Sequence, residues 1–136
     1  QPRSRGLGDV YKRQLSDKVK AGAAVCWMVT TDCQFSWEYG KERGGFANML
    51  PGIRRYLDYP HIASIACPKP MFFLNGEHDK LFPPVGVNAA FAEMRKVWES
   101  RSAGEKLVTE LWDMPHDCGI KVQDAILSFL NKNLAQ

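Results

Sequence analysis

The chain has 136 residues, of which 45% are hydrophobic and 24% charged, and this composition is typical of one globular domain. The formal net charge of +3 comes from residues 1–14, so the remaining residues carry equal numbers of acidic and basic side chains. This balance gives no basic face for nucleic acid, and no apolar run is long enough to cross a bilayer, so we expect neither a nucleic-acid nor a membrane partner.

The sequence of residues 1–14 does not resemble that of a natural folded protein. The segment Ser4–Gln14, SRGLGDVYKRQ, resembles the in-frame translation of a transposase-type sequencing adapter. We therefore expect residues 1–14 to be a non-native tail and residues 15–136 to form part of a single domain, with native sequence beginning near Leu15.

The first predicted strand, Val19–Val29, is a nearly continuous run of small and apolar residues, as in a central parallel strand covered on both faces. The following segment, Thr30–Gly45, has no clean period and predicts a long, lid-like loop beyond the end of the strand. Trp27 lies near the end of the predicted strand, and Phe35 and Trp37 lie within the predicted loop. These aromatic side chains are candidates for a substrate-binding surface, and core packing is an equal alternative for Trp27.

The rest of the chain predicts alternating helices and strands. Short helices are expected at Phe46–Leu50, at Gly52–Leu57 and just after Asp58, which is placed to cap the last of them. Strands are expected at Pro70–Asn75 and Lys106–Trp112. Longer helices follow them, the first marked by an apolar stripe from Val87 to Trp98 and the second spanning Ile120–Leu134. This order predicts an α/β fold with about three parallel strands, crossover helices and an insertion after the first strand.

Asp79 follows the apolar strand and Gly break of KPMFFLNGEHDKLFPP (Lys69–Pro84). A carboxylate at the carboxyl end of a buried parallel strand can hold the Nδ1–H of a histidine and stabilise the imidazolium. The alternative is an N-cap for the next helix, although Asp79 lies early for that role. We therefore predict a catalytic Asp79.

His116 ends the next strand-to-turn unit, LVTELWDMPH. A general base needs a pKa near the working pH and some freedom of movement, which suits a turn. Neighbouring parallel strands end at the same edge of a sheet, so His116 and Asp79 are predicted to meet there. The alternative is a surface or capping histidine.

The sequence favours neither a metal site nor a cofactor. His78 adjoins Asp79 and Asp117 adjoins His116, but adjacent side chains at a turn usually point apart. The four cysteines, Cys26, Cys33, Cys67 and Cys118, lack metal-ligand spacing and are expected as free thiols, with a Cys26–Cys33 disulfide left open.

A nucleophile is missing from this pattern. None of the serines lies in a Gly-x-Ser-x-Gly elbow, and Cys26 is not placed on a strand-to-helix elbow. The acid and the histidine alone cannot complete a hydrolytic triad.

Four segments together resemble the carboxyl-terminal half of an α/β-hydrolase: VKAGAAVCWMVTTD, LPGIRRYLDYPHIASIACPKPMFFLNGEHDKLFP, FAEMRKVWES and ELWDMPH. Within that superfamily they are most similar to the dienelactone-hydrolase and acetyl-xylan-esterase branch. The resemblance implies that Asp79 is the triad acid and His116 the triad base. It also implies that the serine elbow belongs on the strand and helix just before Leu15.

The expected function is therefore that of a fragment of a serine hydrolase, which cleaves carboxylic esters or acylated carbohydrates and is inactive without its serine. An α/β-hydrolase peptidase has the same acid–histidine layout and stays open. A non-catalytic binding module that uses the aromatic loop is the alternative from another class. Without a preceding strand, the apolar strand Val19–Val29 would be an exposed edge, and the fragment would self-associate through it.

Overall fold

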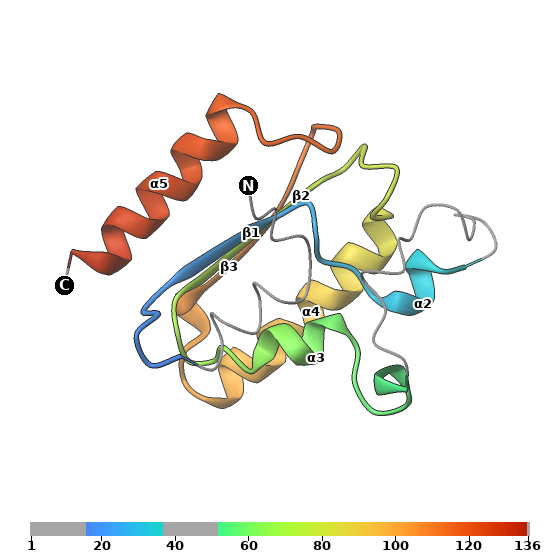
Figure 1. The fold of residues 1–136 in the computed structure, drawn as a ribbon, viewed down its shortest axis with the longest axis horizontal. Helices are drawn as coiled ribbons and strands as arrows, with labels where there is room; N and C mark the ends of the chain where they lie inside the picture. The colour runs from blue at the N-terminus through green and yellow to red at the C-terminus, as the bar shows by residue number, and fades with distance from the viewer. Residues whose placement is uncertain (1–15, 37–51, 136) are drawn as a thin grey trace.

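The computed structural model describes residues 16–36 and 52–135, and these residues form an α/β structure (Figure 1). Its sheet contains strands β1 (Gly22–Val25), β2 (Met71–Gly76) and β3 (Leu107–Trp112) in the order β1-β2-β3. Both pairs are parallel, with Gly22 opposite Met71 and Met71 opposite Leu107. The predicted fold class and the parallel three-stranded sheet are confirmed.

Helices cover both faces of the sheet. Helices α3 (Tyr59–Ser64) and α4 (Pro84–Ser100) lie on one side, and α5 (Ile120–Leu134) lies on the other, as Figure 1 shows. Between β1 and β2 the described chain also forms α2 (Thr31–Gln34) and the 3-10 turn η2 (Ile53–Arg55), and a second 3-10 turn, η3 (Gly104–Lys106), precedes β3. The layers explain why β2 is apolar from Met71 to Leu74.

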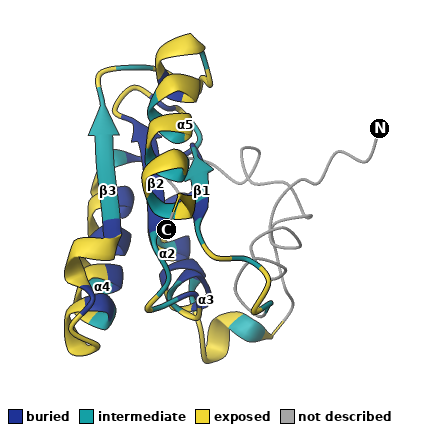
Figure 2. Cartoon of the chain, turned by 90° about the vertical axis from the view of Figure 1, so that its left-hand side faces the viewer, coloured by how far each residue is buried: buried dark blue, intermediate teal, exposed yellow. Residues whose placement is uncertain are grey.

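Strand β2 is buried at every residue, as its dark colour in Figure 2 indicates. Successive side chains of a strand point to opposite faces. Met71 and Phe73 therefore join the core beneath α3 and α4. Phe72 and Leu74 pack toward α5 instead, and the Phe72 ring stacks on Phe129 with centroids 5.6 Å apart.

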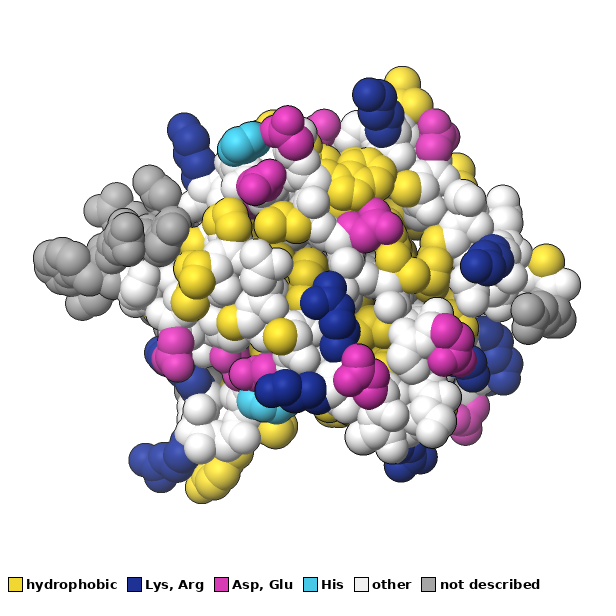
Figure 3. Space-filling model, turned by 180° about the vertical axis from the view of Figure 1, so that it is seen from behind, with side chains coloured by type: hydrophobic (Ala, Val, Ile, Leu, Met, Phe, Trp, Pro, Cys, Tyr) yellow, Lys and Arg dark blue, Asp and Glu magenta, His cyan; other side chains and the backbone are white. Residues whose placement is uncertain are grey.

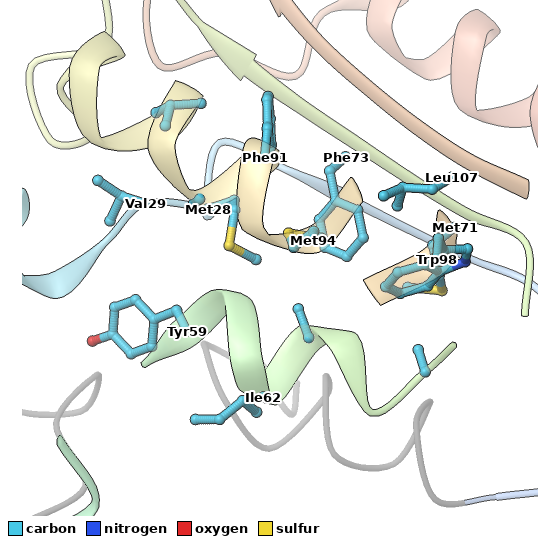
Figure 4. Packing of buried hydrophobic residues seen from close by; sticks show 14 of the residues in the cluster. Met28, Val29, Tyr59, Ile62, Met71, Phe73, Phe91, Met94, Trp98 and Leu107 are labelled. Atoms are coloured by element: carbon cyan, nitrogen blue, oxygen red, sulfur yellow. The ribbon is translucent and has the colours of Figure 1, made fainter. Parts of the chain in front are cut away.

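The larger core lies between the sheet and α4, and its main residues are shown in Figure 4. The stripe predicted from Val87 to Trp98 is confirmed, because its members are buried except for the partly buried Val97. Trp98 is fully buried, and its indole N–H donates to the carbonyl oxygen of Lys69 at 3.2 Å. This bond satisfies the one polar atom of the largest core side chain.

The α5 face is less well covered. The predicted bounds of this helix are confirmed, but Val122 is its only buried residue, and Leu134 of the predicted stripe is 54% exposed. Ile120 and Leu127 are exposed as well. None of the helices in the described ranges is long and apolar enough to cross a membrane.

Asp58 caps α3 as predicted. Its carboxylate accepts the backbone N–H of Tyr59 at 2.7 Å, and the ring of His61 accepts the backbone N–H of Asp58 at 2.8 Å. These reciprocal bonds form a capping box. The same carboxylate accepts the N–H of Thr31 at 3.0 Å, which joins the start of α2 to the start of α3.

Two predicted boundaries were wrong. The first strand is four residues long rather than the whole of Val19–Val29, because Cys26 has φ +50° and turns the chain out of the strand. Met28 and Val29 enter the core after this turn instead of extending the sheet. Thr31–Gln34 is helical where a loop was expected. The tail at residues 1–14 and the helix expected at Phe46–Leu50 lie outside the described residues.

Strand β1 is an edge strand of the described three-stranded sheet. Self-association through this segment stays a prediction. Light scattering coupled to size-exclusion chromatography is expected to report a mass above that of one chain, and the mass should fall toward the monomer in mild denaturant. A monomer that unfolds in one cooperative transition would contradict the prediction.

Candidate active site

Two turns at the carboxyl edge of the sheet carry the candidate residues. The turn after β2 is bonded to the turn after β3 by backbone hydrogen bonds, from the N–H of Glu77 to the carbonyl of Trp112 at 2.7 Å and from the N–H of His78 to that of Met114 at 3.0 Å. The two turns therefore hold each other in register. This connection places Asp79 and His116 side by side.

Gly76 permits the close approach of these turns. A Cβ atom at this position would lie 2.3 Å from the carbonyl oxygen of Met114 and 2.5 Å from that of Pro115. Both obstacles are backbone atoms, which cannot rotate away as the end of a side chain can. The Gly break in the sequence is thus a steric requirement of the site.

Asp79 is buried, with 3% of its surface exposed, and both carboxylate oxygens are bonded. Oδ1 accepts the backbone N–H of Leu81 at 2.8 Å, and Oδ2 lies 2.7 Å from Nδ1 of His116. The local bond fixes the carboxylate while the second oxygen faces the histidine. The structure thus brings together the two side chains that the sequence predicted as acid and base.

His116 is anchored on one side and open on the other. Its side chain is 51% exposed, and its ring stacks on buried Phe82 at a centroid distance of 6.0 Å and an interplanar angle of 16°. Nδ1 is engaged by Asp79, so proton transfer to a reacting group would fall to Nε2. The ring is therefore oriented by two contacts and reachable from solvent.

Cys26 is a third member of the site that the sequence analysis did not place there. It follows β1 directly and is 6% exposed. Its Sγ, a carboxylate oxygen of Asp79 and a ring nitrogen of His116 all lie within 4.8 Å of one another. The thiol donates to the carbonyl oxygen of Asp117 at 3.6 Å. Burial raises the pKa of Cys26, and the charge of Asp79 adds to the effect, so the group is held as a neutral thiol.

Two of the three aromatic candidates, Trp27 and Phe35, lie within the described residues. Trp27 is partly buried against the core and packs on Tyr59 with ring centroids 5.4 Å apart. Phe35 follows α2 and is half-buried, and Trp37 lies outside the described residues. The substrate-binding role of these three residues stays a prediction. His78 pairs through Nε2 with Asp113 at 2.7 Å on the surface, so it points away from the dyad.

A pocket of about 690 Å³ lies between the end of β3 and the start of α5, and neither Asp79 nor His116 is among its lining residues. Its walls include Trp112, Met114 and Ile120 together with Asp117 and Lys121. The pocket therefore combines apolar surface with a negative charge from Asp117, the residue after His116, and a positive charge from Lys121.

The chain matches no protein-family model. The chain is 26% identical over 100 residues to the protein named "Putative hydrolase YtaP" of Bacillus subtilis (strain 168), a match that covers 74% of this chain and 33% of that protein. The chain thus spans about a third of the length of the curated relative it matches.

Two solved structures are similar in fold. One is a carbohydrate esterase family 15 glucuronoyl esterase from Caldicellulosiruptor kristjansonii, with a TM-score of 0.71, 12% identity, and coverage of 93% of this chain and 40% of that one. The other is Methylesterase BT1017, with a TM-score of 0.64, 17% identity, and coverage of 93% of this chain and 27% of that one. The described structure therefore has the fold of a portion of each of these two larger proteins, and at these identities the similarity concerns the fold alone.

Proposed function

We propose that this chain supplies the acid and the base of a serine hydrolase that cleaves carboxylic esters. The observation that carries the proposal is the 2.7 Å contact between Nδ1 of the half-exposed His116 and the buried carboxylate of Asp79. The serine and the oxyanion donors belong, in this proposal, to a segment that precedes Leu15. The name of the similar hydrolase and the two esterase folds support this reading.

The mechanism follows from the position of each group. Nε2 of His116 accepts the proton of the serine hydroxyl as its oxygen attacks the ester carbonyl carbon. Asp79 stabilises the resulting imidazolium through Nδ1–H. The imidazolium then donates its proton to the alcohol oxygen as the C–O bond breaks. Water, deprotonated by the same nitrogen, hydrolyses the acyl-enzyme.

A small ester or acylated carbohydrate is the proposed substrate class. The pocket between β3 and α5 is lined by Trp112 and Met114 together with the charged residues Asp117 and Lys121, a mixture of apolar and polar groups that suits a sugar derivative. The face seen in Figure 3 mixes acidic, basic and apolar side chains, so neither sign of charge dominates it.

A serine-directed fluorophosphonate probe tests the proposal. The genomic sequence before Leu15 is expected to encode a strand, a Gly-x-Ser-x-Gly elbow and a helix, and the longer product is expected to react with the probe at that serine. The 136-residue chain is expected to remain unlabelled. Labelling of a serine within the chain would overturn the division of the triad, and an Ala or Gly in place of the elbow serine would favour a non-catalytic binding module.

A further inference from the structure

Cys26, Asp79 and His116 bring three different metal-binding atoms to one point. The sulfur, the carboxylate oxygen and the ring nitrogen lie within 4.8 Å of one another. Donor atoms around a tetrahedral Zn²⁺ lie roughly 3.3–3.8 Å apart for bonds of about 2.0–2.3 Å. Shifts of about an ångström or less in the side chains would therefore bring the three atoms around one ion.

The charge of the site also suits a divalent ion. A thiolate and a carboxylate together balance the two positive charges of the metal, while neutral imidazole adds the third ligand. Such balance matters because Cys26 and Asp79 are both buried, where an uncompensated charge is costly. Thiolate and imidazole ligands favour Zn²⁺ over Mg²⁺ or Ca²⁺.

The surroundings meet the other requirements of a metal site. Leu81 holds the second oxygen of Asp79 by its backbone N–H, and Phe82 fixes the plane of the His116 ring. The His116 side chain is 51% exposed, so one of the three ligands is open to solvent. Three protein ligands leave a fourth position for water.

We propose that Cys26, Asp79 and His116 form a site for one Zn²⁺-like divalent ion. Binding replaces the thiol proton of Cys26, which leaves to solvent, and coordinates the two side chains that form the dyad. The ion and the hydrolytic reaction therefore exclude each other, and Zn²⁺ acts as a reversible inhibitor. The inference shares its residues with the proposed function, but metal binding itself does not depend on hydrolysis.

Cobalt titration of the reduced 136-residue chain tests the site without any activity assay. One equivalent of Co²⁺ is expected to produce a near-ultraviolet thiolate-to-cobalt band and the visible bands of a tetrahedral ion, and Zn²⁺ should abolish both. Cys26→Ser is expected to remove the thiolate band and to weaken Zn²⁺ binding by more than about 10-fold. His116→Gln, at a half-exposed position, should weaken binding similarly and serves if Cys26→Ser does not fold.

Two matched variants control for adventitious binding. Cys118→Ser removes an exposed free thiol, and His78→Ala removes a surface imidazole next to Asp79 in sequence. Both are expected to retain the spectrum and the affinity. A thiolate band that persists in Cys26→Ser, full affinity in His116→Gln, or loss of the band in Cys118→Ser would overturn the site. None of these results depends on whether the longer protein hydrolyses esters.

Discussion

In a protein that joins this chain to its serine-bearing segment, His116→Ala is expected to lower kcat/KM for aryl esters by about 10⁴-fold or more. The reason is that the serine then has no base, and the leaving alcohol has no acid. Asp79→Asn is expected to cause a loss of similar order, because an amide can hold the imidazole in the wrong tautomer and cannot stabilise its charged form. Initial rates on p-nitrophenyl acetate measure both effects.

A neighbouring histidine provides the control. His78 lies one residue before Asp79 but pairs with Asp113 on the surface, so His78→Ala should leave the rate nearly unchanged. Binding of substrate is carried by other groups, so the dyad variants should lower kcat far more than they raise KM. Ester hydrolysis near the wild-type rate in either Asp79→Asn or His116→Ala would show that the assigned roles are wrong.

Gly76→Ala is expected to lower the free energy of unfolding by about 1–3 kcal/mol, as overpacking of a closed site does. The added methyl would lie 2.3 Å from a backbone carbonyl oxygen of the turn after β3. That turn must move outward, and His116 moves with it. Urea denaturation of the 136-residue chain measures the loss of unfolding free energy. In NMR spectra of the variant, the nuclear Overhauser effect between the ring protons of His116 and Phe82 should be weaker than in the parent chain.

Gly104→Ala is the matched control for this effect. A Cβ atom there would meet only the Cγ of Glu99 at 3.5 Å, which is an ordinary contact. Its unfolding free energy should stay within about 0.5 kcal/mol of the parent value, as surface substitutions usually do. Equal stabilities of the Gly76 and Gly104 variants would contradict the steric role given to Gly76.

The sequence predicted best where a local pattern and the tertiary structure agree. β2 and α4 have strong apolar patterns, and both were placed within a few residues of their observed bounds. The dyad could be foreseen because parallel strands that are neighbours must end at one edge, so a strand–Gly–acid unit and a strand–His unit come together. These arguments need only periodicity and connectivity.

Cys26 could not be placed in the same way. The run from Val19 to Val29 is small and apolar apart from Lys20, and nothing in it marks the residue that adopts a left-handed conformation. Its side chain reaches Asp79 and His116 only because β1 ends beside β2 at the same edge of the sheet, which is a contact between distant parts of the chain. The one sequence signal for Cys26 was a cysteine near the carboxyl end of a predicted strand. This signal is weak, because it does not show which other strand ends lie beside that cysteine.

The backbone bonds between the two turns have a consequence for local opening of the site. The backbone N–H groups of Glu77 and His78 donate to the carbonyl oxygens of Trp112 and Met114. Neither turn can therefore move away from the other without breaking these two hydrogen bonds. Hydrogen exchange at these amides would therefore occur through one cooperative opening rather than by separate fraying. Asp79 and His116 would lose their mutual geometry in that same event, so the dyad exists either complete or not at all.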